Sequence, residues 1–267
     1  MIGLAKKRKR LTKQIYPKTI QRDYARELLR VVEIVKEEIA GLLNDLPKMM
    51  EVAANELRQD AGEGKKVQDL VNAAIARIGA RLSTPQLETL GKRYATQISS
   101  YQKIQLKKQV EQTFGVDVFA GDRNLQAMMD GFVSENVGLI RDMPRKILGG
   151  VEGVILRGVT GGKLHGQIAE DLNKQFRIGE TRAKLIARDQ VGKFYGQLNA
   201  SRQKALGVER FVWETVRDNR VRPEHRDRQG KIFSWDDPPS DGLPGEPINC
   251  RCFATPIFDE LLGEVSL

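Results

Sequence analysis

Two cysteines and one of the two histidines fall in the last fifth of the sequence, close enough to meet in one folded unit. Cys250 and Cys252 flank Arg251, and His225 precedes them within the same stretch, 213–256, which also holds both tryptophans. Thiolate and imidazole groups are the ligands that Zn²⁺ prefers. A thiol beside an imidazole is also the pattern of a cysteine nucleophile and its base. Both kinds of chemistry therefore have to be weighed.

A structural zinc ion is the first interpretation. Its candidate ligands are His225, Cys250, Cys252 and, for the fourth position, Asp218 or Asp227. The C-x-C spacing is tight for two sulfur ligands of one tetrahedral ion, and the positive charge of Arg222 would oppose a cation. The alternative is that His225 forms hydrogen bonds within its loop while both thiols are buried as small apolar side chains. We expect no bound cofactor, and zinc remains the open alternative.

Catalysis is a second interpretation of the same residues. Cys250, His225 and Asp218 could be written as a thiol triad, although their spacing does not favour one. A nuclease of the HNH type would use His225 and Asn249 near a metal, but the expected helix with a further histidine is missing after the predicted hairpin. The sequence also has no G-x-x-x-x-G-K-[ST] phosphate loop. We therefore predict that the chain is not an enzyme.

Arg251 has a structural interpretation of its own. A guanidinium between two small apolar side chains on a short strand cannot easily reach water on both sides, and its planar fork fits a carboxylate. We expect Arg251 to be buried against Asp218 or Asp227 and to lock the loop.

The elements that carry these residues are predicted to be β-rich. Strand-forming residues occur at 211–216, 230–235 and 250–255, and a proline- and glycine-rich loop occupies 236–248. Two helices, 163–176 and 180–205, come directly before them. The sequence therefore predicts a C-terminal unit of helices packed on a small antiparallel β-sheet.

The first part of the chain is predicted to be helical. One apolar stripe at helical spacing contains Tyr24, Leu28, Val31, Val35, Ile39, Leu42 and Leu46. Pro47 is expected to end or kink this helix. Further helices are predicted at 67–82, from Ser83-Thr84-Pro85 to Phe114-Gly115, and at 123–160, the last with interruptions at Pro144 and Gly149-Gly150. The fold class is α+β and mostly α, with long N-terminal helices.

Charge and composition limit the classes of function. The 267 residues carry a net charge of +9, and two closely spaced cysteines exclude a secreted disulfide scaffold. No apolar run is long enough to span a membrane, and no signal peptide is recognised, so we expect synthesis in the cytoplasm. The densest basic segment, 1–20, contains Lys6, Lys7, Arg8, Lys9 and Arg10. This segment is either a disordered solubilising tail or a binding arm. As an arm, it would bind DNA without sequence preference or bind an acidic protein surface.

The C-terminal motifs resemble those of a known family. The run D-x-R-V-R-x-x-H, then G-K-x-F, then P-G-x-P-x-N-C-R-C is similar to the bacteriophage head-morphogenesis family, the Mu protein F-like minor capsid proteins. The motif residues are Asp218, Arg220, His225, Gly230, Asn249, Cys250, Arg251 and Cys252. Many relatives carry C-x-x-C where this chain has Arg222 and His225, and His-Pro before the final N-C-R-C. This departure bears on metal binding.

The charge and apolar patterns divide the chain into a basic arm at 1–20, a helical region at 21–160 and a short tail at 259–267. The resemblance covers about 163–258 and implies a head-morphogenesis domain there. Family members are minor head components in few copies, associated with the portal vertex and acting in head assembly and DNA packaging or delivery. The implied partners are the portal protein, other head proteins and DNA bound without sequence preference. No membrane partner is implied. The implied location is the virion, and the host cytoplasm during assembly. The alternative is a metal-dependent, nuclease-like enzyme that uses the cluster of His225, Asn249, Cys250 and Cys252.

Overall fold

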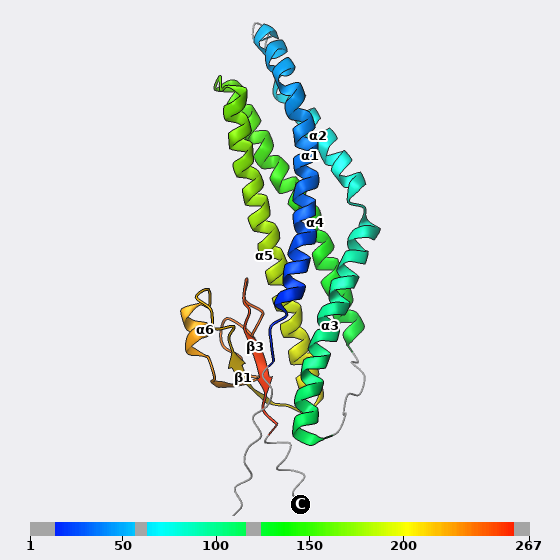
Figure 1. Cartoon of the computed structure of the whole chain (residues 1–267), viewed down its shortest axis with the longest axis vertical. Helices are drawn as coiled ribbons and strands as arrows, with labels where there is room; N and C mark the ends of the chain where they lie inside the picture. The colour runs from blue at the N-terminus through cyan, green and yellow to red at the C-terminus, as the bar shows by residue number, and fades with distance from the viewer. Residues whose placement is uncertain (1–13, 57–62, 116–123, 259–267) are drawn as a thin grey trace, which may run out of the picture. The chain divides into compact units, whose positions relative to one another are not determined.

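The structure, a computed structural model, describes residues 14–56, 63–115 and 124–258 (Figure 1). The elements are α1 (Lys18–Glu56), α2 (Glu63–Arg81), α3 (Thr84–Phe114), α4 (Leu125–Thr160), α5 (His165–Ala205), β1 (Arg210–Glu214), α6 (Pro223–Asp227), β2 (Ile232–Ser234) and β3 (Phe253–Pro256). The fold is mostly helical with one small C-terminal sheet, which confirms the predicted class. Within the described residues, no helix has both the length and the apolar character needed to span a bilayer.

The chain divides into two compact units, and the first of them is all-helical. It comprises 22–92 and 133–187, so it takes most of α1 and α4, all of α2 and the first part of α5. The predicted stripe on α1 is confirmed where its side chains are described: Tyr24, Leu28, Val31, Val35 and Ile39 are all buried. Leu42 and Leu46 lie outside the described side chains.

The second unit contains the sheet and combines 1–21, 93–132 and 188–267, within which the structure describes 14–21, 93–115, 124–132 and 188–258. β1 is the central strand of the order β2-β1-β3, and both pairings are antiparallel. One face of the sheet builds a core of Phe211, Trp213, Trp235, Cys250, Cys252 and Ala254. In Figure 1, this sheet lies beside the C-terminal part of α5, drawn in yellow. The three predicted strands and the loop at 236–248 are therefore confirmed, with boundaries shifted by one to three residues.

Several predicted helix breaks are wrong. α4 continues through Pro144 and Gly149-Gly150, and α5 is one helix where two were predicted. At Pro47, where the helix was expected to end or kink, α1 does not end but continues to Glu56. Proline inside a helix costs about 3 kcal/mol. In α4 that cost is outweighed because Met143, Ile147 and Leu148 around Pro144 are buried in the same core.

Candidate functional site

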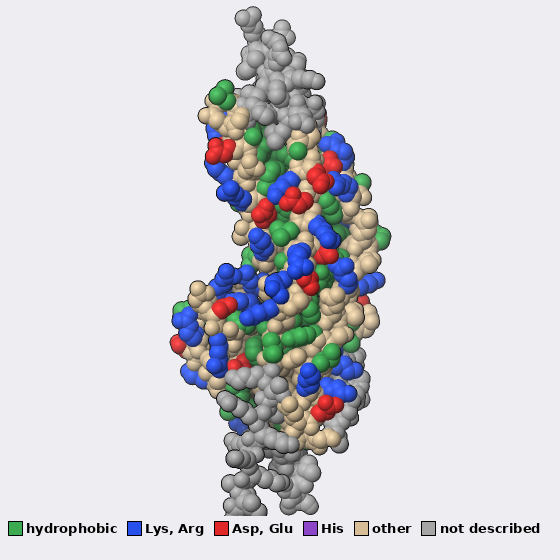
Figure 2. Space-filling view, in the orientation of Figure 1, with side chains coloured by type: hydrophobic (Ala, Val, Ile, Leu, Met, Phe, Trp, Pro, Cys, Tyr) green, Lys and Arg blue, Asp and Glu red, His purple; other side chains and the backbone are tan. Residues whose placement is uncertain are grey.

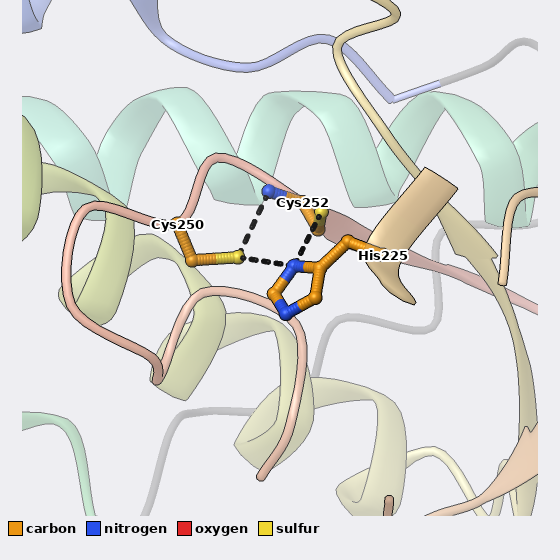
Figure 3. Close-up of side chains that lie close together, drawn as sticks. All are labelled: His225, Cys250 and Cys252. Carbon is orange, nitrogen blue, oxygen red and sulfur yellow. Dashed lines mark hydrogen bonds between the residues drawn. The ribbon is translucent and has the colours of Figure 1, made fainter. Parts of the chain in front are cut away.

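His225, Cys250 and Cys252 converge in the second unit (Figure 3). Nδ1 of His225 lies 3.5 Å from Sγ of Cys250 and 3.4 Å from Sγ of Cys252. The histidine comes from α6, whose first turn is favoured by Pro223, and the cysteines come from the segment that leads into β3. All three side chains are buried. The three ligand-type residues of the sequence are thus brought together.

Asp241 fixes the orientation of the imidazole. Nε2 of His225 lies 2.9 Å from Oδ2 of Asp241, and Nη1 of Arg228 donates to Oδ1 of the same carboxylate at 2.6 Å. Burial opposes ionisation of Asp241, but the hydrogen bonds from His225 and Arg228 lower its pKa. An ionised carboxylate only accepts hydrogen bonds, so Nε2 carries a hydrogen and Nδ1 faces the sulfurs. Asp241 was not identified from the sequence, because nothing marks it within the proline-rich loop.

The two thiols shift each other's pKa in opposite directions. Hydrogen bonds from the Cys252 thiol, from His225 and from the backbone N–H groups of Cys252 and Gly245 lower the pKa of Cys250, against the effect of burial. The backbone N–H of Cys252 lies 3.4 Å from Sγ of Cys250. The pKa of Cys252 is raised by its bond to Cys250 and by burial. The pKa of His225 is raised chiefly by its hydrogen bond to Cys250 and also by Asp241, against the effect of burial.

A small pocket of about 40 Å³ adjoins the cluster. His225, Cys250 and Cys252 form one side of it, and Asn249, Arg220 and Arg222 belong to its lining. A volume of this size accommodates one or a few water molecules. The candidate ligands therefore face a space that a small solute can occupy.

Helix α5 holds the cysteine-bearing loop through two glycines. A Cβ added at Gly192 would lie 2.5 Å from the carbonyl oxygen of Cys250, and one at Gly196 would lie 2.5 Å from that of Pro244. The loop backbone therefore lies directly on one face of α5. It contacts the helix at two points that are one helical turn apart. This G-x-x-x-G spacing is visible in the sequence, but its role was not predicted.

Asn249 acts as a turn residue in the structure. Its φ of 63° lies in the left-handed region, which asparagine tolerates better than most residues. Its N–H donates to Asp189 at 2.8 Å, and its Oδ1 accepts a hydrogen bond from Arg188 at 2.9 Å. Asn249 therefore lines the same pocket as His225, but its amide oxygen is already engaged by α5.

Arg251 pairs with Asp218, one of the two partners expected from the sequence. Nη1 and Nη2 of Arg251 donate to the two carboxylate oxygens at 2.6 and 2.8 Å. The side chain of Arg251 is 11% exposed and that of Asp218 is 36% exposed. Hydrogen bonds from Arg251 and from the backbone N–H of Arg220 lower the pKa of Asp218. Asp218, a candidate fourth metal ligand in the sequence, is thus engaged elsewhere, and the exposed Asp227 is not in the cluster with His225.

The remaining predicted residues have simpler roles or fall outside the description. Gly230 has a φ of 79°, and its N–H donates to the carbonyl of Trp213 at 2.8 Å, so it forms the turn between α6 and β2. The basic residues Lys6, Lys7, Arg8, Lys9 and Arg10 lie outside the described residues. Figure 2 shows that Lys and Arg outnumber Asp and Glu on the visible surface of the lobe that contains α6.

A buried polar network beside the sheet was not predicted from the sequence. Arg202 donates to the carbonyl of Ser99 at 2.8 Å and to Oε1 of Gln102 at 2.6 Å. Gln102 donates to Oδ1 of Asn199 at 2.8 Å, which links α3 to α5. Such groups are tolerated in a core only because they are paired. The signal in the sequence that could have revealed this network is the presence of polar residues on the apolar face of the predicted helix 180–205.

Known proteins match this chain over its C-terminal part and, in one relative, over most of its length. Residues 150–255 match the family described as Phage Mu protein F like protein. An uncharacterized protein of Haemophilus influenzae is 24% identical over 233 residues, which are 84% of this chain and 52% of the relative. An uncharacterized protein of Methanocaldococcus jannaschii is 31% identical over 107 residues, 40% of this chain and 17% of that relative. The chain thus spans about half of the first relative and under a fifth of the second. No solved structure matches the chain significantly.

Proposed function

Because residues 150–255 form a Phage Mu protein F-like domain, we propose that this chain is a minor head protein of a bacteriophage. It is present in few copies in the virion and acts at the portal vertex in head assembly and in DNA packaging or delivery. The family match carries this proposal, because it covers α5, the sheet and the His225–Cys250–Cys252 cluster. The chain joins the portal protein and other head proteins in the host cytoplasm.

Non-specific contact with DNA is part of the proposal. The segment with Lys6, Lys7, Arg8, Lys9 and Arg10 supplies clustered positive charge, which binds phosphates through counterion release. Exposed arginines around α6, among them Arg220, Arg222 and Arg226, add a second basic surface. Both groups of basic residues suit a protein that contacts DNA while the DNA enters or leaves a phage head.

The proposal is tested in the phage or prophage genome that encodes the chain. Quantitative mass spectrometry of purified heads should find the chain at a small fraction of the copy number of the major capsid protein. Deletion of its gene should yield heads that lack DNA or fail to deliver it, and co-purification with tagged portal protein should recover the chain. Absence from purified heads, together with normal infective particles from the deletion strain, would refute the proposal.

A metal-dependent DNA-acting enzyme is the second candidate function. The observation that favours it is the pocket in which His225, Cys250 and Cys252 meet Asn249 and two arginines. The test is nicking of supercoiled plasmid with and without added Zn²⁺, Mg²⁺ or Mn²⁺, with Cys250→Ser as the matched control. Metal-dependent nicking that the control loses would support an enzyme. Nicking equal in both proteins, or none, would reject it.

A further inference from the structure

We propose that His225 Nδ1 and the Sγ atoms of Cys250 and Cys252 bind one Zn²⁺ ion, whose fourth coordination position faces the adjoining pocket and takes a water molecule. The proposal does not depend on the role of the chain in a phage head. It rests on the placement of three buried ligand atoms, on the groups that orient them and on the charges around them.

The two distances from the imidazole nitrogen to the sulfurs fit a tetrahedral ion. With Zn–S bonds of about 2.3 Å and Zn–N bonds of about 2.05 Å, a tetrahedral angle separates nitrogen from sulfur by about 3.6 Å and the two sulfurs by about 3.8 Å. The observed N–S distances are 3.5 and 3.4 Å, and all three atoms lie within 4.8 Å of one another. The C-x-C spacing, which looked too tight in the sequence, therefore places both sulfurs at a suitable distance from the same imidazole nitrogen.

A single ion also accounts for the arrangement better than a thiol triad does. Cys250, His225 and Asp241 have the order of nucleophile, base and orienting carboxylate. However, Nδ1 has only one lone pair, and two sulfurs approach it at nearly equal distances. A catalytic pair requires one thiol, whereas a cation placed between the three atoms engages both thiols and the imidazole at once.

The surroundings of the three atoms are those of a metal site. The carboxylate of Asp241 on Nε2 of His225 repeats the carboxylate–histidine–metal arrangement that fixes the tautomer of a metal-bound imidazole. The backbone N–H of Cys252 points to Sγ of Cys250 at 3.4 Å, where it stabilises an anionic sulfur. These contacts hold two of the ligands in position before any ion arrives.

The nearby arginines are either screened by solvent or paired with acids. Arg220 and Arg222 line the pocket but are exposed, so solvent screens their charges, and Arg222 donates to the carbonyl of Ile248 at 2.6 Å. Arg251 is paired with Asp218, and Arg228 is paired with Asp241. Two thiolates neutralise a divalent ion, and two sulfurs with one imidazole favour Zn²⁺ over Mg²⁺, Ca²⁺ or Mn²⁺. Three protein ligands leave one tetrahedral position, and the pocket of about 40 Å³ offers room for its water.

The experiment measures metal in the full-length chain, purified without a histidine tag in reducing buffer. Elemental analysis should find about one zinc per chain. Replacement by Co²⁺ should give the visible and charge-transfer absorption of tetrahedral thiolate-bound cobalt. Cys250→Ser and Cys252→Ser should each lose the stoichiometric metal and that absorption. Asp241→Asn should keep the stoichiometry and weaken zinc affinity roughly 10- to 100-fold, because only the orientation of His225 is relaxed.

Arg202→Met is the matched control, because it perturbs a buried network in the same unit and leaves the three ligands in place. It should retain the zinc. A wild-type chain that contains no zinc and takes up neither Zn²⁺ nor Co²⁺ would overturn the proposal. Zinc that persists in both cysteine variants would overturn it as well. If both cysteine variants and the control lose metal through misfolding, the cobalt spectrum of the wild type decides, because thiolate charge transfer arises only at these two cysteines.

Discussion

The pairing of Arg251 with Asp218 predicts an asymmetric effect of removing either partner. In Asp218→Asn, one carboxylate oxygen becomes an NH₂ group that faces a guanidinium donor, and Arg251, 11% exposed, is left without a counter-charge. The charge of Arg188 is close enough to interact with that of Arg251. In Arg251→Met, by contrast, the carboxylate left behind is 36% exposed and can be hydrated. The loss of the acid should therefore cost more than the loss of the arginine.

The magnitude follows from the burial of the two groups. Hydrogen bonds to charged groups contribute about 1.5–3 kcal/mol, and breaking a fully buried pair costs about 3–5 kcal/mol. Exposed pairs contribute about 0.2–1 kcal/mol. Because Asp218 is more than a third exposed, we expect Asp218→Asn to cost about 1–3 kcal/mol, and Arg251→Met to cost about 0.5–2 kcal/mol.

The assay uses the two tryptophans of the chain as local reporters. Trp213 and Trp235 are both buried in the sheet core, so their fluorescence during urea unfolding reports on this unit. Midpoints compared at constant slope give the differences in unfolding free energy. Equal midpoints for wild type and Asp218→Asn, or a larger loss in Arg251→Met, would show that the argument from burial is wrong.

The same pair predicts a pH dependence. The pKa of Asp218 is lower in the folded chain than its unfolded value of about 3.9. Its contribution to stability is therefore complete above that value and is lost as the pH falls through the folded pKa. The difference between wild type and Asp218→Asn should persist at pH 7 and shrink below about pH 4, as measured by the same urea titration. A difference that stays constant down to pH 2.5 would contradict the ionic origin of the effect.

Three further predictions concern other parts of the chain. Gly196→Ala should destabilise the second unit by roughly 1–3 kcal/mol in the same fluorescence assay, because the new Cβ meets the backbone oxygen of Pro244; an unchanged midpoint would mean that α5 and the loop separate freely. Arg202→Met should cost about 1–3 kcal/mol, because the carbonyl of Ser99 and the amide of Gln102 lose a buried donor; wild-type stability would show that water replaces the guanidinium. Deletion of 1–20 should flatten the salt dependence of duplex DNA binding, whose log–log slope should be near −6 if about seven phosphates are contacted; an unchanged slope would move the contact to the arginines around α6.

The sequence was sufficient to predict most helices and strands and the grouping of His225, Cys250 and Cys252. It was not sufficient to predict which residues form hydrogen bonds to this group. β-Branched and aromatic residues marked β1 and β2, and the motif spacing identified His225, Cys250 and Cys252 as one group. Asp241 could not be assigned, because the path of a loop with four prolines before Cys250 determines which of its acids reaches His225. The helix breaks at Pro144 and Gly149-Gly150 were predicted wrongly, because local propensity is weaker than burial of a long apolar face.

The β3 edge of the sheet is covered by side chains of α5, which limits pairing between copies of the protein at high concentration. β3 is an edge strand, and the carbonyl of Ala254 accepts hydrogen bonds from Nδ2 of Asn199 at 3.0 Å and from Nε2 of Gln203 at 3.1 Å. These two amides, one turn apart on α5, occupy a position that a strand of another molecule would otherwise take. Pro256, at the end of β3, has no N–H to offer. Uncovered strand edges promote aggregation, so α5 protects the β3 edge from pairing with a strand of a neighbouring copy.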